Sequence, residues 1–201
     1  MLKRATFYIV GLFILGLGIS FTIKAEVGTG AWDALNVGLT KLIGFTVGTW
    51  LMVIGLLLIF INAFISQEKP KFSSMLTPIL IGFTVDFWML FGLIHFHVDG
   101  LFFQYIWFFI GVVLIAVGVA MYLQADFAPN PIDNFMISLH KRFGLNLMTA
   151  KTIGEVIAFV LALLLQGPIG IGTIIITIII GPIIQFFYKP IQNLYKKWKF
   201  V

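Results

Sequence analysis

The stretch GISFTIKAEVGTGAWDALNVGLTKLIG, residues 18–44, recurs one hundred residues later as GVAMYLQADFAPNPIDNFMISLHKRFG, residues 118–144. The two copies align without a gap, and the forty positions 11–50 hold eight identities with the second half. Most identical positions are Gly, Asp or Lys, including the pair Asp33 and Asp133, so shared apolar character does not explain the match. A fixed internal period indicates a duplicated structural unit.

The composition of the chain excludes a soluble domain. Of its 201 residues, 60% are hydrophobic and 10% are charged, and the mean hydropathy is +1.07. A soluble domain carries about 25% charged residues. We therefore expect an integral membrane protein whose first partner is the lipid bilayer. The chain has no cysteine, which excludes disulfides and thiolate metal sites.

Six apolar stretches are long enough to cross a bilayer, because a spanning helix needs about 20 mostly apolar residues. The predicted spans are about 5–23, 47–65, 74–96, 102–123, 148–166 and 171–188. Residues 24–46 and 124–147, which carry most of the repeated stretch, are too long for turns and too polar to span. Each is predicted to hold one short helix, at roughly 30–42 and 130–143.

Three spans in each half require the second half to insert upside down relative to the first. The sequence therefore predicts an all-α membrane protein with six transmembrane helices in two inverted three-helix repeats, about 5–96 and 102–188. Each repeat has a half-helix or re-entrant segment after its first span, and both belong to a single membrane domain, residues 1–201. The alternative is a set of apolar helices with chance matches.

The repeat continues into the third span of each half. The stretch TPILIGFTVDFW at 77–88 resembles TIIITIIIGPIIQFF at 173–187 after a slip of one residue. Asp86 then stands opposite Gln185. The duplication accordingly extends over all three spans of each half.

The positive charges predict that both termini lie in the cytoplasm. Eleven of the thirteen Lys and Arg residues then fall on the cytoplasmic side, and Lys24 and Lys41 fall outside. The cytoplasmic set is Lys3, Arg4, Lys69, Lys71, Lys141, Arg142, Lys151, Lys189, Lys196, Lys197 and Lys199. The net charge of +5 thus reflects topology, without nucleic acid as a partner. Residues 189–201 are expected to form a basic tail that touches anionic lipid.

Each polar segment carries the signals of a helix start. Asn130 is a strong N-cap, Pro131 suits the first helical position, and Asp133 then lies at the third position, where a carboxylate meets the positive helix end. The first copy has the same register, with Gly30 as the cap and Asp33 at the third position. Each copy therefore breaks the chain and begins a short helix with an Asp in its first turn.

Two interpretations of these segments stay open. Asp33 and Asp133 could only cap two helices that lie at the membrane interface. Alternatively, both helices dip inward and their N-termini meet a central site from opposite faces, because irregular backbone at depth is tolerated where it is buried in protein or lines a watery cavity. Paired carboxylates there suit a cation, an amine or proton coupling. Glu26 and Asp126, facing acids of the same segments, are further candidates, and Trp32 either lines this site or anchors the interface.

Two acids lie inside predicted spans. Asp86 is near the centre of the third span, where a charge costs several kcal/mol unless it is paired, neutralised or hydrated. Glu155 follows Lys151 by four residues in the fifth span, so an ion pair along the helix is one explanation. The other is that Glu155 and Asp86 line one cavity with the acids of the polar segments.

The stretch GLGISFTIKAEVGTGAWDAL at 16–35, followed by a Gly-rich span, resembles bacterial integral membrane proteins of the YczE/YyaS/YitT type. The G-T-G-x-W-D core at 28–33 and its N-P-x-D counterpart at 130–133 carry the resemblance, which is closest to YczE-like members because only a short basic tail follows the spans. It implies a multi-pass protein of the bacterial plasma membrane, and no particular substrate.

These features favour a small-solute transporter with a central site between the repeats, coupled to a cation or to protons. The alternative is a solute-binding or accessory subunit of a larger transport or biosynthetic complex, like the substrate-binding components of energy-coupling-factor transporters. No nucleophile constellation, metal motif or phosphate loop supports an enzyme, and no metal or cofactor is expected. The small-residue faces of the spans also allow a homodimer.

Overall fold

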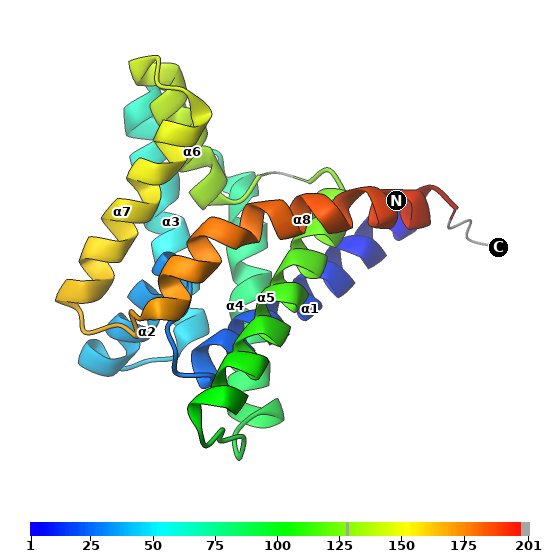
Figure 1. The fold of residues 1–201 in the computed structure, drawn as a ribbon. Helices are drawn as coiled ribbons and strands as arrows, with labels where there is room; N and C mark the ends of the chain where they lie inside the picture. Colours follow the sequence, from blue (N-terminus) through cyan, green and yellow to red (C-terminus); the bar gives the residue numbers. More distant parts are fainter. Residues whose placement is uncertain (128, 198–201) are drawn as a thin grey trace.

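The computed structural model describes residues 1–127 and 129–197, and the secondary structure in these ranges is entirely helical (Figure 1). In chain order the elements are α1 (Leu2–Lys24), α2 (Ala31–Ile43), α3 (Val47–Ser66), the 3₁₀ helix η1 (Phe72–Met75), α4 (Leu76–Phe87), the π-helix η2 (Trp88–Gly92), α5 (Leu101–Leu123), α6 (Pro131–Phe143), α7 (Leu147–Leu164) and α8 (Ile171–Lys197).

Six helical stretches are long and apolar enough to span a membrane, which confirms the predicted number of spans. They are α1, α3, the continuous run Phe72–Gly92, α5, α7 and α8. The third ends four residues before the predicted boundary at 96. The sixth continues through Pro182 and Pro190 to Lys197, so the first part of the predicted basic tail is a continuation of this helix, and residues 198–201 of that tail lie outside the described residues.

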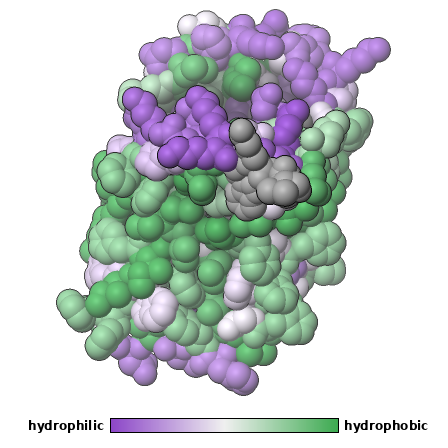
Figure 2. Space-filling view, turned by 90° about the vertical axis from the view of Figure 1, so that its right-hand side faces the viewer, coloured by the Kyte–Doolittle hydropathy of each residue, from purple (hydrophilic) through white to green (hydrophobic). Residues whose placement is uncertain are grey.

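The surface is that of a membrane protein. Figure 2 shows a broad apolar belt between two polar ends. Large apolar side chains are exposed on several helices, among them Phe64 of α3, Phe83 of α4 and Ile178 of α8. Exposed apolar side chains on this scale fit hydrocarbon and would be costly in water.

The first spans of the two halves form the central packing pair, α1 against α5 (Figure 1). A Cβ added at Gly11 would lie 2.9 Å from the carbonyl oxygen of Gly118, and one at Gly18 would lie 2.7 Å from that of Gly111. The glycines thus let the two backbones approach closely. Because residue 11 meets 118 and residue 18 meets 111, α1 and α5 run antiparallel.

The two short helices cross between the halves. Helix α2 packs against α3 of its own half and α7 of the other, and α6 packs against α7 of its own half and α3 of the other. Their observed bounds agree with the predicted 30–42 and 130–143 to within one residue. Neither is long enough to cross a membrane.

The last two spans of each half are arranged differently. In the first half α4 packs tightly on α3. A Cβ added at Gly82 would lie 2.6 Å from the carbonyl oxygen of Gly48, and one at Gly55 would lie 2.8 Å from Pro78. In the second half α7 and α8 diverge from the turn that joins them (Figure 1). Nothing lies within 4 Å of a Cβ added at Gly181, the counterpart of Gly82.

Candidate functional site

A cavity of about 390 Å³ lies where the N-termini of α2 and α6 meet. All eight α-helices contribute to its wall. Five of the predicted site residues line it: Trp32, Asp33, Asn130, Asp133 and Glu155. The cavity therefore brings together acids that are up to 122 positions apart in the sequence.

The start of α2 is held by the turn between α7 and α8. Gly28 has a φ of +106°, and a Cβ there would lie 2.7 Å from the amide nitrogen of Gly170, so both the backbone angle and the close approach require glycine. The amide of Gly172 donates to the carbonyl of Val27 at 2.8 Å. These contacts explain why the chain has a glycine at position 28, two residues before the N-cap Gly30.

Helix α2 begins as the sequence predicts. Gly30 is the N-cap, and Asp33 is the third residue of the helix. A Cβ at Gly30 would lie 3.1 Å from Oδ2 of Asp33, so this carboxylate turns back toward the cap. The Asp33 carboxylate thus stands at the positive end of the helix and on the cavity wall at once.

The start of α6 is held by the first half. Asn130 caps the helix, its side chain accepting from the amide of Ile132 at 3.3 Å, and Asp133 is the third residue. Asn62 of α3 donates to the carbonyl of Pro131 at 2.9 Å. Packing between the halves, in addition to the cap, therefore positions Asp133.

Helix α7 adds one acid and one base to the wall. Glu155 and Lys151 both line the cavity. Within the described residues the ion pairs closer than 4.0 Å are Arg4–Asp126, Lys71–Glu68 and Lys141–Glu68, so the explanation of Glu155 as half of a helix ion pair with Lys151 is not supported. The cavity thus holds three carboxyl groups and one ammonium group.

Asp86 lies outside this cavity. Its carboxylate accepts from the hydroxyl of Thr46 at 2.6 Å and from the amide of Gly48 at 2.8 Å. It therefore binds the N-terminus of α3 from α4, which gives this half-buried carboxylate its partners without a lysine. The expectation that Asp86 shares a cavity with Glu155 is wrong for this conformation.

Glu26 and Asp126 also lie away from the cavity. Both are exposed residues with positive φ, at +58° and +51°, just after α1 and α5. Arg4 donates to the backbone carbonyls of Ala125 at 2.7 Å and Asp126 at 2.6 Å. These two acids thus occupy matching helix-end turns, and the cavity wall that the structure describes does not include them.

Besides Lys151, which was predicted only as an ion-pair partner of Glu155, sequence reasoning missed two polar residues of the wall, Tyr122 and Thr177. Tyr122 lies near the end of α5, and Thr177 lies in α8 among isoleucines. Neither belongs to a motif, and hydroxyl side chains are common in membrane helices, so no pattern along the chain distinguishes them. Only helix packing places them beside the acids.

A second cavity of about 470 Å³ lies between α7 and α8. It shares Ala31, Lys151, Glu155 and Thr177 with the central cavity. Most of its remaining wall is apolar, including Val156 and Ile178. The central cavity therefore adjoins a groove at the place where α7 and α8 diverge, with these four residues as the common wall.

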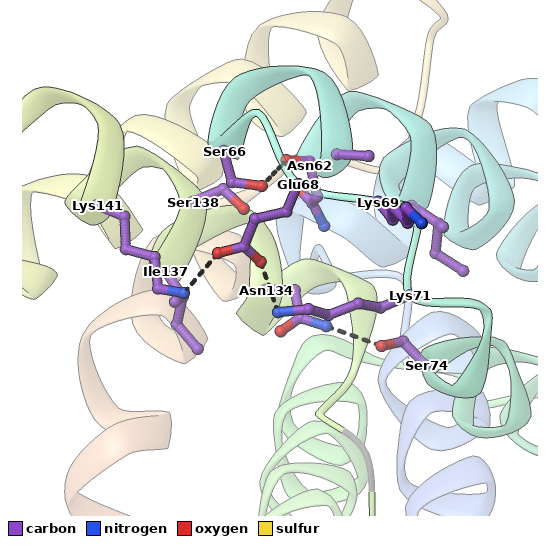
Figure 3. A pocket seen from close by; sticks show the side chains of 12 residues that line it. Asn62, Ser66, Glu68, Lys69, Lys71, Ser74, Asn134, Ile137, Ser138 and Lys141 are labelled. Atoms are coloured by element: carbon purple, nitrogen blue, oxygen red, sulfur yellow. Dashed lines mark hydrogen bonds and ion pairs between the residues drawn. The ribbon is translucent and has the colours of Figure 1, made fainter.

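A polar cluster ties the loop after α3 to α6 (Figure 3). Glu68 lies 2.8 Å from Lys71 and 3.1 Å from Lys141, and Asn134 donates to Ser74 at 2.8 Å. Hydrogen bonds from Lys71 and then Lys141 hold the pKa of Glu68 below its ordinary value. The hollow here is only about 30 Å³, room for about one water, so it is a structural contact and not a solute site.

The model of a family of unknown function, DUF6198, matches residues 2–189. The chain belongs to the DUF6198 family. It is 37% identical over 185 residues to the uncharacterized protein YyaS of Bacillus subtilis (strain 168), covering 92% of each chain. It is 34% identical over 187 residues to the uncharacterized membrane protein YczE of the same organism, covering 92% of this chain and 86% of that one.

A more distant relative of this DUF6198 member is an uncharacterized protein of Haemophilus influenzae, 26% identical over 195 residues, which cover 96% of this chain and 86% of the relative. No solved structure matches. These comparisons confirm the resemblance to YczE and YyaS, and the name of YczE supports a membrane protein. Membership of the YitT type stays a prediction.

Proposed function

We propose that this chain is a small-solute membrane transporter that works by alternating access to the central cavity. The observation that carries the proposal is the cavity itself, which is closed between α3 and α4 and open between α7 and α8. Acids from both halves line it, at the starts of two short helices. Central sites at discontinuous helices between repeats are typical of secondary transporters.

The packing of α1 on α5 supports two inverted repeats. Residue 11 meets residue 118, and residue 18 meets residue 111, so each position meets the repeat-equivalent of the other. Such reciprocal contacts are those of a two-fold interface. The short helices show the same reciprocity, because α2 of the first half packs on α7 of the second, and α6 of the second half packs on α3 of the first. A two-fold axis in the membrane plane, between α1 and α5, accounts for all four contacts.

The departure from symmetry supports two alternating states. Gly48, Gly82 and Asp86 close α3 against α4. Their counterparts are Met148, Gly181 and Gln185 on the diverging helices α7 and α8, and Met148 is 82% exposed. In the opposite state α7 and α8 would close and α3 and α4 would open. With both termini in the cytoplasm, as the Lys and Arg distribution favours, the present opening faces inward.

The three acids of the cavity support coupling to a cation or to protons. Carboxylates at a membrane-embedded site are costly unless a ligand or a proton neutralises them. One ammonium group, that of Lys151, balances only part of this charge. A solute cation or a proton bound in one state and released in the other would supply the remainder.

Single cysteines test alternating access cleanly, since the chain has none of its own. Thr152 lines the open groove, and Met52, its repeat-equivalent, packs beside Gly82 between α3 and α4. We expect an impermeant maleimide to label Thr152→Cys from the cytoplasmic side and Met52→Cys from the outer side. Met52→Cys that stays unlabelled from the outer side, with and without solute, would contradict transport and favour a binding subunit.

A further inference from the structure

The groove between α7 and α8 has one polar end and one apolar end. At the polar end Lys151 and Glu155 join it to the central cavity. The apolar wall is formed by Val156, Phe159, Ile174, Ile178, Pro182 and their neighbours. Ile178 is 68% exposed and Val156 is 54% exposed. A solute that fills both spaces therefore needs a polar head and a hydrocarbon portion.

The charges at the polar end select the sign of the head. The walls of the two cavities carry Asp33, Asp133 and Glu155 against one cation, Lys151. Ionised, these groups sum to a net negative charge, which disfavours a phosphate, a sulfate or a carboxylate and attracts a cation. The head of the solute is accordingly positive.

Trp32 indicates an organic cation. Trp32 lines the central cavity together with Asp33 and Glu155, and it also lines a smaller space of about 170 Å³ together with Asp133 and Glu155. Tryptophan is the best aromatic partner for an ammonium group. Within the described residues no three acids or histidines are grouped to hold a metal ion. Because these acids are not grouped as metal ligands, a bulky ammonium head suits the cavity better than a bare metal ion does.

We propose that the site takes an amphipathic organic cation, its ammonium head among Trp32, Asp33, Asp133 and Glu155 and its hydrocarbon portion in the groove between α7 and α8. The assignment rests on the proposed function and names its substrate class. The central cavity and the groove measure about 390 and 470 Å³, which suits a head and a short chain. The groove opens among exposed apolar side chains, so the hydrocarbon portion enters from the lipid side.

Binding to the protein in lipid nanodiscs tests the substrate class. We would measure equilibrium dialysis of radiolabelled hexyltrimethylammonium, tetramethylammonium and hexyl sulfate, with empty nanodiscs to subtract partition into lipid. The hexyl cation should bind at least roughly tenfold more tightly than tetramethylammonium, because its methylenes are buried in the groove. Hexyl sulfate should not bind. Equal affinity for the two cations, or binding of hexyl sulfate, would overturn the assignment.

Two variants test separately where the ammonium head and the hydrocarbon portion of the solute bind. Ile178→Trp fills the groove and should remove the preference for the hexyl cation while tetramethylammonium still binds. Ile110→Trp, on a lipid-facing position of α5, is the matched control and should change neither affinity. Glu155→Gln should weaken both cations by about tenfold or more, since a desolvated charge partner is lost. If Ile178→Trp still prefers hexyltrimethylammonium over tetramethylammonium, the hydrocarbon portion does not bind in the groove.

Failure of this assignment is distinguishable from failure of transport. If Met52→Cys is labelled from the outer side but no cation binds, the substrate class is wrong and alternating access stands. If the hexyl cation binds as expected but Met52→Cys is never labelled, the ligand class stands and the chain is a binding subunit. Labelling that increases or decreases on adding hexyltrimethylammonium would support both proposals together.

Discussion

Asp33 and Asp133 each have two physical roles, one at the start of a helix and one on the wall of the cavity. As third residues of α2 and α6 they face the positive helix ends, and as wall residues they face the cavity. The helix-end role stabilises each short helix by about 0.3–1 kcal/mol. A role in binding a cation involves a larger free energy, since a desolvated charge pair is lost with either carboxylate. The two roles therefore differ in what a substitution changes.

Asp33→Asn and Asp133→Asn should each weaken binding of a cationic solute by about tenfold or more while the folded yield stays near that of the parent chain. Asparagine keeps the size and a hydrogen-bonding oxygen but removes the charge. Dialysis gives the affinity, and size-exclusion chromatography gives the yield. Asp126→Asn, in an exposed helix-end turn, is the control. If Asp33→Asn and Asp133→Asn both lose folded protein, and the protein that does fold keeps its affinity, the two carboxylates act only as helix caps.

Glu68 provides a pH test outside the membrane. Its ion pairs with Lys71 and Lys141 lower its pKa in the folded state, so the pairs stabilise the fold fully above the ordinary value of 4.5. That contribution is lost as the pH falls through the lowered folded pKa. The difference in Tm between the parent and Glu68→Gln should be positive at pH 7 and vanish in acid.

Lys69→Gln is the control for this titration, because Lys69 lies in the same loop without an ion pair within 4.0 Å in the described chain. It should leave the pH dependence of Tm unchanged. A parent-to-variant difference for Glu68→Gln that stays constant from pH 7 to acid would show that its carboxylate contributes through contacts that do not depend on charge.

At the scale of helices, the contact of α3 with α4 is tight, and under the proposed alternating access it would be the closed gate of the cavity. Gly48 and Gly82 bring the two backbones together, and Asp86 binds the start of α3. The equivalent contact between α7 and α8 is absent from the described structure, where Gly181 has open space around it. Helices α3 and α4 thus pack on each other, whereas α7 and α8 do not, and the proposed alternating access would exchange these two arrangements.

Gly82→Ala and Gly181→Ala form a matched pair on α4 and α8. The added methyl at residue 82 would lie 2.6 Å from the carbonyl oxygen of Gly48, whereas at residue 181 it meets nothing within 4 Å. Gly82→Ala should therefore destabilise the closed gate by about 1–3 kcal/mol. Faster labelling of Met52→Cys from the outer side would report this, and equal labelling in both variants would contradict the gate.

Asp86→Ala should open the same gate by another route. It removes the acceptor for the Thr46 hydroxyl and the Gly48 amide, which leaves the start of α3 without its partner on α4. Labelling of Met52→Cys should rise several-fold. Gln185→Ala, the repeat-equivalent on α8, which does not pack against α7, should leave that labelling unchanged. A rise in both variants would indicate general loosening instead of a specific latch.

At the scale of the whole molecule, the close packing of α1 on α5 joins the two halves, and in the proposed mechanism this pair would be the scaffold. Gly18→Val should abolish folding, because even a Cβ there would lie 2.6 Å from the amide nitrogen of Ile115 and 2.7 Å from the carbonyl of Gly111. Gly181→Val, inside α8, is the sterically free comparison, because a Cβ there meets nothing within 4 Å. Folded yield after purification measures the effect. Native yield of Gly18→Val would refute the scaffold.

The predicted spans and short helices needed only local information. Span length, the cap signals at Asn130 and Gly30, and the third-position acids depend on residues within one or two turns. The place of Asp86 was predicted less well, because its partners Thr46 and Gly48 lie 40 and 38 positions away. Glu26 and Asp126 matched in sequence because they share a turn geometry, and that match carried no information about the cavity.

The amino-acid sequence by itself determined a bilayer protein of six spans, with two chain breaks that each place an Asp in the first turn of a short helix. Hydropathy and capping act over short distances, so they can be read along the chain. Only the tertiary structure decided that Asp33, Asp133 and Glu155 line one cavity, that Asp86 binds a helix end instead, and that α7 and α8 stand apart. These depend on packing between halves one hundred residues apart, where glycine contacts on α1 and α5 set the geometry.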